Sequence, residues 1–216
     1  MQRVVVLLTF AWMLLAAHSV RAQDPPPRIG PFVVDVHASV PKFPSDQFLA
    51  DSRDMVLAEL PGRGLGIQIG ATVYPLRWRA VTFGVGGEFA TSRARKAAVA
   101  ASAQSEALRG AEEKFTSLAP QLSFNFGNGH GWSYISGGLA RSTWSLIPDG
   151  RPAFPSDSEK LKTINYGGGA RWFMKAHLAF SFDVRFYAIN PGSPYLAFPG
   201  SPRTTLMVIG AGVSVK

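Results

Sequence analysis

Apolar and polar residues alternate along several long segments of the chain, and this alternation predicts most of its structure. In residues 65–74 the odd positions are apolar and the even positions are polar or small. Residues 81–89 and 178–188 show the same alternation. A repeat of two residues places neighbouring side chains on opposite sides of a β-strand, so each segment has one apolar and one polar face.

Eight such segments can be assigned, and their length favours a barrel that crosses a membrane over a soluble sandwich. Many exceed the average globular strand of about 5 to 6 residues and reach the roughly 9 to 11 residues that a tilted membrane-spanning strand needs. An even strand number also places both ends of the chain on one side of the membrane. The predicted strands are residues 32–40, 64–74, 79–90, 115–126, 132–146, 162–173, 178–189 and 204–215.

The connections between the predicted strands are of two kinds. Tight turns are expected at residues 75–77, 127–131 and 174–177, and long polar segments at residues 41–63, 91–114, 147–160 and 190–203. The alanine-rich run 97–103 lacks the apolar stripe of a partner-binding helix, so a solvated or partly disordered loop is expected there. The sequence thus predicts an all-β fold, an eight-stranded antiparallel transmembrane β-barrel with short periplasmic turns and long extracellular loops.

The composition excludes several classes of protein. The 216-residue chain has no cysteine, which excludes a disulfide framework, a thiolate zinc site and a cysteine nucleophile. Charged residues make up 17% of the chain, below the roughly 25% of a typical soluble domain. The net charge of +8 does not indicate nucleic-acid binding, because three glutamates closely follow the densest basic cluster, Arg93, Arg95 and Lys96. These cations suit solvated loops or neighbouring lipopolysaccharide phosphates.

Residues 1–22 have the features of a cleaved signal peptide. Arg3 precedes an apolar stretch at residues 4–17, and Val20 and Ala22 stand at the two positions that a signal peptidase reads. The stretch is shorter than the roughly 20 apolar residues of a spanning helix. Residues 23–31 then form a proline-rich leader, and residues 32–216 form the barrel, expected in the outer membrane of a Gram-negative bacterium.

Five aromatic residues are predicted to ring the barrel where lipid meets water. Such girdles border the apolar band of outer-membrane barrels. Four of the five lie beside predicted short turns and one beside a long loop: Trp78, Phe126, Trp132 and Trp172, and Trp144, respectively.

One predicted hairpin resembles that of a known family. Residues 165–173 read NYGGGARWF, residues 174–177 read MKAH, and residues 178–187 read LAFSFDVRFY. This segment is similar to the penultimate hairpin of small eight-stranded outer-membrane barrels of the OmpA-like family, and the resemblance covers the mature chain from residue 32 onward. It implies that Gly167, Gly169, Asp183 and Arg185 occupy recurrent family positions.

Two features depart from the pattern of that family. Residues 213–216 read VSVK and lack the terminal aromatic residue that the outer-membrane assembly machinery, the expected partner in insertion, usually recognises. Pro120 falls within a predicted strand, where it removes a hydrogen-bond donor from the ladder. A bulge or a different strand boundary is therefore expected near Pro120.

Charged residues on the inner face are predicted to close the barrel. Eight strands leave a lumen just wide enough for side chains to fill, and charges buried there must pair. The predicted lumen charge network is Asp35, Glu88, Arg171, Asp183 and Arg185. The main functional prediction is therefore a monomeric, non-enzymatic barrel without cofactor or metal, which serves as an envelope structural or surface-interaction protein among outer-membrane lipid and lipopolysaccharide.

Two alternative functions stay open. The first is a lipid A-modifying hydrolase, because His37-Ala38-Ser39 resembles the His-x-Ser pair of one deacylase family, in which a base activates the serine. The second is a soluble periplasmic barrel with its apolar face turned inward. In that case Phe180, Phe182 and Phe186 would bind a small apolar ligand.

Overall fold

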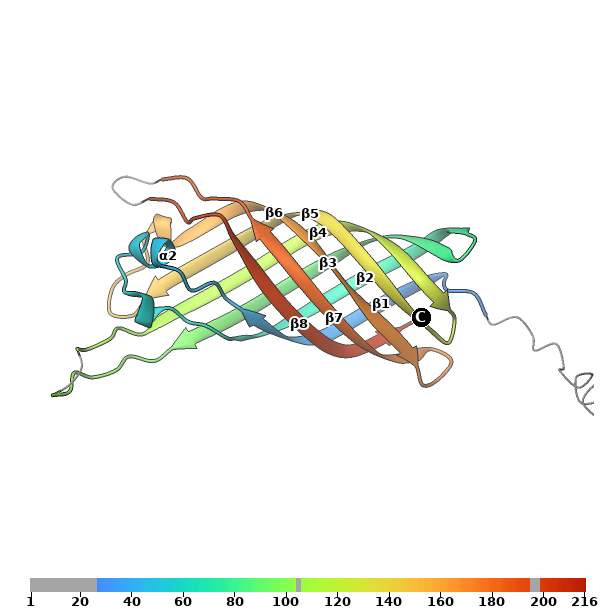
Figure 1. Cartoon of the computed structure of the whole chain (residues 1–216), viewed down its shortest axis with the longest axis horizontal. Coiled ribbons are helices and arrows are strands. Elements are labelled where there is room, and N and C mark those ends of the chain that lie inside the picture. Colours follow the sequence, from blue (N-terminus) through green and yellow to red (C-terminus); the bar gives the residue numbers. More distant parts are fainter. Residues whose placement is uncertain (1–26, 104–105, 195–198) are drawn as a thin grey trace, which may run out of the picture.

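A computed structural model describes residues 27–103, 106–194 and 199–216, and eight antiparallel strands within them close into a barrel (Figure 1). Each strand pairs with its neighbour in sequence, and β1 pairs with β8 to complete the ring. The strands are β1 (Phe32–Lys42), β2 (Leu65–Trp78), β3 (Val81–Lys96), β4 (Ala111–Asn128), β5 (Gly131–Pro148), β6 (Ser158–Phe173), β7 (Leu178–Ile189) and β8 (Thr204–Val215). The predicted signal peptide and residues 23–26 of the leader lie outside the described residues. The predicted barrel fold is confirmed.

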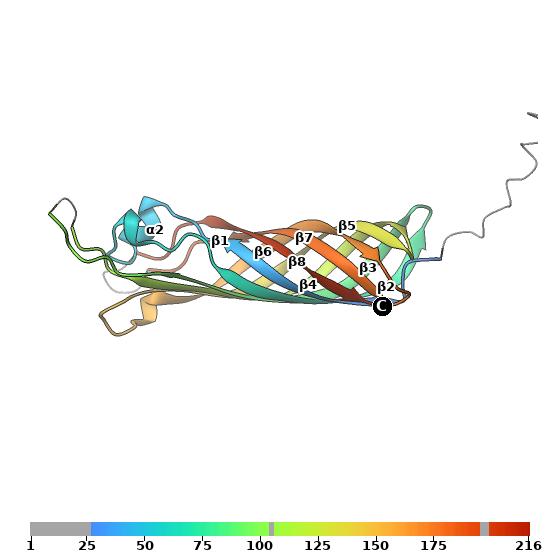
Figure 2. The same ribbon diagram turned by 90° about the horizontal axis from the view of Figure 1, so that it is seen from below.

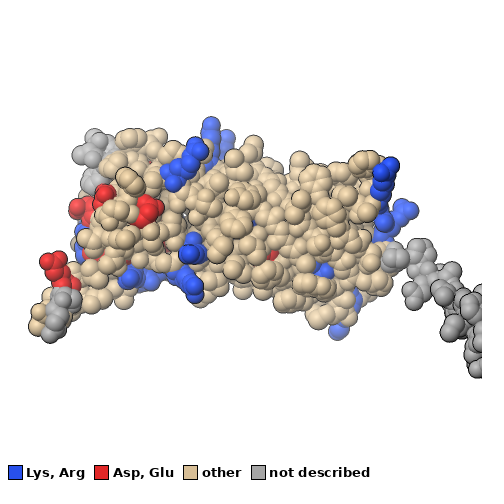
Figure 3. Space-filling view, viewed as in Figure 1, with Lys and Arg blue, Asp and Glu red and all other residues tan. Residues whose placement is uncertain are grey.

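Outward-facing side chains form an apolar belt around the barrel. Along β1 buried and exposed residues alternate, and Phe32, Val34, Val36 and Val40 are exposed. Other strands contribute exposed apolar residues in the same way, among them Ile67, Val85, Leu122, Ile135, Ile164 and Ile209. On the face shown in Figure 3, Lys and Arg gather toward the two edges of this belt, and Asp and Glu gather at the loop end. So many exposed apolar side chains indicate an outer surface that contacts lipid.

The three phenylalanines of the predicted ligand pocket lie on this outer face. Phe180 stacks on Trp172 of β6, and Phe186 stacks on Tyr166 of the same strand. Phe182 is exposed on the same face of β7. The alternative of a barrel with these side chains turned inward is therefore wrong, because the alternation along β7 places its polar residues inside.

Four neighbouring strands are longer than predicted at the loop end. β3 and β6 have 16 residues and β4 and β5 have 18, whereas β7 and β8 have 12. The connections are correspondingly shorter than predicted, at residues 97–110 and 149–157. Residues 97–103 form no helix, and a bridge between Val99 and Leu108 joins the two sides of their loop.

The first predicted tight turn is displaced. The β2–β3 register shifts between Val73 and Leu76, which accommodates Pro75, and β2 continues to Trp78. The turn lies at residues 79–80 instead of 75–77. The proline therefore bends the pairing locally and does not end the strand.

Pro120 causes neither a bulge nor a strand boundary. β4 pairs with β5 at Leu118↔Arg141 and again at Gln121↔Gly138, so the register is the same on both sides of the proline. A Cβ at Gly138 would lie 1.9 Å from the Pro120 carbonyl oxygen. Glycine at that position lets the two strands approach where the ladder bond is lost.

Short helices cover the loop end of the barrel. The first long connection contains α2 (Gln47–Asp51) and the 3-10 helix η2 (Leu57–Glu59), and the third contains the 3-10 helix η3 (Pro155–Asp157). Asp46 caps α2 by accepting a hydrogen bond from the Leu49 backbone N–H at 2.9 Å. Figures 1 and 2 show α2 at the loop end, and both ends of the described chain at the short-turn end. No described helix is long and apolar enough to cross a membrane.

Candidate functional site

A buried ion pair joins two strands across the barrel interior. The Arg171 guanidinium on β6 donates to both carboxylate oxygens of Asp35 on β1, at 2.8 and 2.6 Å. The Ser214 hydroxyl on β8 donates to the same carboxylate at 2.5 Å. Arg171 also lies over the ring of Tyr134, 4.0 Å from its centroid. The bidentate pairing of Arg171 with Asp35 and the hydrogen bond from Ser214 offset much of the desolvation free energy that burial of the two charges costs.

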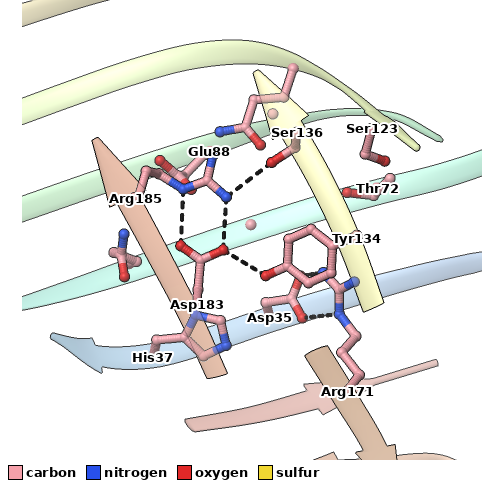
Figure 4. Close-up of a pocket in the computed structure, with 14 residues that line it drawn as sticks. Asp35, His37, Thr72, Glu88, Ser123, Tyr134, Ser136, Arg171, Asp183 and Arg185 are labelled. Carbon is pink, nitrogen blue, oxygen red and sulfur yellow. Dashed lines mark hydrogen bonds and ion pairs between the residues drawn. The ribbon is translucent and has the colours of Figure 1, made fainter. Parts of the chain in front are cut away.

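A second charged cluster is centred on Arg185 of β7. Its guanidinium donates to Asp183 at 3.1 and 2.9 Å and pairs with Glu88 of β3 at 2.8 Å. Tyr134 donates to Asp183 and Tyr187 donates to Glu88, each at 2.7 Å. Figure 4 shows that the two clusters point into the same space. The structure thus places inside the barrel all five residues of the predicted lumen network, Asp35, Glu88, Arg171, Asp183 and Arg185.

Little free space remains among these side chains. The cavity that both clusters line has a volume of about 30 Å³, room for no more than a few water molecules. Gly169 helps to make this packing possible, because a Cβ there would lie 2.8 Å from the Tyr134 hydroxyl and 2.1 Å from the Phe182 carbonyl oxygen. Gly169 thus leaves room for the tyrosine that holds Asp183.

His37 and Ser39 both point into the barrel. His37 Nε2 lies 2.7 Å from the Ser181 hydroxyl on β7, and Ser39 is buried. Neither side chain reaches the outer surface where a lipid substrate would lie, so this geometry speaks against a lipid hydrolase built on the pair. Within the described residues no group of three or more His, Asp or Glu side chains could hold a metal ion.

An apolar cluster, here called the upper apolar cluster, fills the barrel on the loop side of the charged residues. Tyr187 contacts both this cluster and the charged residues. Its ring packs against Phe115, with 5.1 Å between the ring centroids, and its hydroxyl donates a hydrogen bond to Glu88. The first long connection inserts five side chains, and the strands supply the rest. The members are Phe43, Leu49, Ala50, Met55, Leu60, Ala90, Ala94, Ala111, Phe115, Trp144, Leu146, Leu161, Tyr187, Ile189, Leu206 and Val208.

Two of the five predicted interface aromatics are not at the interface. Trp144 is 2% exposed and belongs to the upper apolar cluster, where its Nε1 donates to Glu113 at 2.8 Å. Trp132 is 3% exposed and stacks on Phe173 inside the short-turn end. Both predictions are wrong because the even positions of β5 face inward. The other three, Trp78, Phe126 and Trp172, face outward near the short turns.

A buried arginine joins the first long connection to the start of β6 and to the connection before β8. Arg53 follows α2, and its guanidinium donates to Glu159 of β6 at 2.7 Å and to the Ser201 hydroxyl at 2.8 Å. Arg53 is 2% exposed. Because Ser201 lies in the connection before β8, a single side chain joins three segments that are far apart in sequence.

Two further ion pairs hold the loops together. Arg109, in the connection between β3 and β4, pairs with Glu59 at 3.3 Å and donates its backbone N–H to the same carboxylate at 2.8 Å. Burial alone would raise the pKa of Glu59, but the hydrogen bonds from Arg109 hold that pKa below its ordinary value. Arg151 binds both oxygens of Asp157, at 2.7 and 2.8 Å. The described parts of the four long connections are together called the loop cap below; they are residues 43–64, 97–103, 106–110, 149–157, 190–194 and 199–203.

A group of outward cations lies at the loop-side edge of the apolar belt. Arg141 on β5 and Lys162 on β6 are direct cross-strand partners, and Lys160 follows two positions along. All three are exposed, and within the described residues none of them has an acidic partner within ion-pair distance. The adjoining outward residues, Leu139 and Ile164, are apolar. Like charges directly opposite each other destabilise a sheet unless an anion lies near them.

The loop cap was absent from the sequence-based expectations. Alternation predicts strands and faces, but at the loop end many inward positions are also apolar, as at Leu146 and Leu161, so an apolar cluster replaces the charged lumen there. Those residues were the available signal that something covers the end of the barrel. The sequence around Arg53 contains no comparable signal, because its ion-pair partner Glu159 is 106 positions away.

Comparison with known proteins supports the fold. No family model matches the chain, and no curated protein matches it, so membership of the OmpA-like family stays a prediction. Among solved structures, the chain is similar to Neisserial surface protein A, with a TM-score of 0.52, 16% identity and coverage of 87% of this chain and 97% of that one. It is also similar to Ail, the attachment invasion locus protein of Yersinia pestis, in complex with the heparin analogue sucrose octasulfate, with a TM-score of 0.50, 14% identity and coverage of 85% and 96%. At such identities the likeness concerns the fold, that of small outer-membrane barrels.

Proposed function

We propose that the chain is a monomeric, non-enzymatic outer-membrane barrel with a closed lumen, which presents its loop cap at the cell surface as a structural or surface-interaction protein. The apolar belt supports the membrane location, since its outward runs have the length that a bilayer requires. Insertion would depend on the outer-membrane assembly machinery.

The observation that carries this proposal is the filling of the barrel along its length. Paired charges occupy the half near the short turns, and the upper apolar cluster occupies the half near the loops. A solute path would have to disrupt both layers and the Arg53 contacts above them. The loop cap is then the part of the molecule best placed to meet partners, because loops on a rigid scaffold carry function.

The closed lumen can be tested by single-channel recording of the refolded mature chain in planar bilayers. We expect no stepwise conductance, because neither layer leaves a continuous water path. Correct insertion is checked first by a mobility difference between unboiled and boiled samples in detergent gels. Regular conductance steps from protein that shows this difference would contradict the closed lumen, and absence of the mobility difference would contradict the membrane barrel itself.

The cations at Arg141, Lys160 and Lys162 suit the phosphates of lipopolysaccharide. They lie at the belt edge nearest the loops, which faces the outer leaflet in the proposed orientation. Negative phosphates would relieve the repulsion between the facing cations Arg141 and Lys162. Each cation near an anionic membrane surface contributes roughly 1 kcal/mol.

We expect the double substitution Arg141→Gln/Lys162→Gln to weaken binding of bis-phosphorylated lipid A to the refolded barrel by about thirtyfold, from two cations at roughly 1 kcal/mol each. Native mass spectrometry in detergent measures the bound fraction. The matched control, Arg77→Gln/Arg79→Gly, removes two cations at the opposite rim and should leave lipid A binding unchanged. Equal losses in the two variants, or equal binding of dephosphorylated lipid A, would rule out this phosphate site.

A further inference from the structure

A group of arginines lies at the short-turn rim, at the end of the barrel opposite the loop cap. Arg28 precedes β1, and Arg77 and Arg79 lie at the hairpin between β2 and β3. All three side chains are exposed. They line an open groove of about 780 Å³, which is completed by Pro27, Ala80, Gly127 and Asn128.

No acidic side chain balances these cations in the part of the chain that the structure describes. The ion pairs found there involve none of the three arginines. Every described Asp or Glu lies in the lumen or on the loop side of the barrel, while Lys175 adds further positive charge to the short-turn rim. A groove with cations alone attracts an anion, because the repulsion between the guanidinium groups is then relieved.

The groove lies at the edge of the apolar belt. Trp78, the outward residue at the end of β2, is 62% exposed, and the Arg79 guanidinium lies 5.4 Å from the centroid of its ring. Outward tryptophans mark the headgroup level of a membrane. An anion in the groove would therefore lie where lipid phosphates lie, with Trp78 beside the upper acyl chains.

Two backbone features mark the segments that carry Arg28 and Arg79. The Gly129 backbone N–H donates to the Pro27 carbonyl at 2.5 Å, which holds the segment with Arg28 against the 127–131 turn. Arg79 has a φ of 54°, in the left-handed region that glycine and asparagine adopt more readily. The β2–β3 turn therefore has an arginine, Arg79, at a position where the positive φ favours glycine or asparagine.

We propose that this groove binds the phosphate of an anionic phospholipid headgroup, of the phosphatidylglycerol class, in the leaflet at the short-turn end. Guanidinium groups donate two parallel hydrogen bonds to phosphate oxygens, and three arginines line this one groove. The inference rests on the proposed function in that the barrel spans a membrane. It concerns a different rim and a different lipid class from the lipopolysaccharide contact.

The test is native mass spectrometry of the refolded full-length mature chain in detergent, with phosphatidylglycerol or phosphatidylcholine added at equal concentration. We expect wild type to retain phosphatidylglycerol in clear preference to phosphatidylcholine. The variant Arg28→Gln/Arg77→Gln/Arg79→Gly should lose at least about tenfold in phosphatidylglycerol binding. The single variant Arg79→Gly serves as a further check. Glycine adopts the positive φ of residue 79 without strain, so a loss of phosphatidylglycerol binding in this variant cannot come from a strained backbone.

The control variant Lys42→Gln/Arg63→Gln/Arg203→Gln removes three exposed cations on the loop side, outside both proposed phosphate sites, and should keep phosphatidylglycerol bound. Equal retention of the two lipids, an equal loss in both triple variants, or full competition by millimolar inorganic phosphate would each overturn the proposal. The gel mobility of the same samples separates these outcomes from a failure of the membrane barrel, which would abolish the mobility difference in wild type as well.

Discussion

Replacing Arg185 by methionine is expected to destabilise the folded barrel by about 3 to 5 kcal/mol. The side chain is 2% exposed and is the shared partner of Asp183 and Glu88, so its loss leaves two buried carboxylates without a cation. The tyrosine hydroxyl groups that hold these carboxylates supply hydrogen bonds but no charge. Methionine keeps much of the aliphatic volume, so the expected loss is mainly electrostatic. Guanidinium-induced unfolding in lipid vesicles, followed by tryptophan fluorescence, measures it.

The triple variant Arg185→Met/Glu88→Gln/Asp183→Asn separates charge from packing. It removes the cation together with both carboxylates, and we expect it to regain most of the lost stability, because neutral amides can keep their tyrosine partners. A single variant as stable as wild type would show that water solvates Glu88 and Asp183, and the lumen would then be open. A triple variant no more stable than the single one would assign the loss to packing.

The strands could be predicted because alternation is a local property. β7 and β8 agree with the predicted ranges 178–189 and 204–215, since apolar and polar faces are regular and loop residues adjoin both strands. The lumen residues followed from the same rule, because Asp183 and Arg185 share the face opposite Phe180 and Phe182. Boundaries were less accurate at the loop ends of β3 to β6, where pairing continues beyond the apolar belt.

Neither the loop cap nor the buried location of Trp132 and Trp144 could be predicted from strand alternation and distance from turns. Trp132 and Trp144 were assigned by their distance from turns, whereas their position on the inward face of β5 decides their environment. The contacts of Arg53 with Glu159 and Ser201 require two connections and the loop end of β6 to meet, and no local pattern encodes such a meeting. The cross-strand pair Arg141 and Lys162 likewise requires the register between β5 and β6.

Trp144→Ala is expected to destabilise the barrel by about 3 to 5 kcal/mol, the usual cost of deleting a large buried aromatic side chain. The upper apolar cluster can collapse only slightly into the space, because the strands around it are fixed by their ladders. Alanine also leaves the buried Glu113 carboxyl group without its indole donor. An interface tryptophan would lack both effects, so the size of the loss distinguishes the two locations.

Trp172→Ala provides the matched comparison, because Trp172 is 54% exposed on the outer face of β6. It creates no internal cavity, so its loss in stability should be clearly smaller than that of Trp144→Ala in the same vesicles. Proteolysis of intact vesicles adds a second readout: Trp144→Ala should speed cleavage in residues 43–64, because Phe43, Leu49 and Leu60 pack in the same cluster. Equal stability losses together with unchanged cleavage would place Trp144 outside the cluster that supports the loop cap.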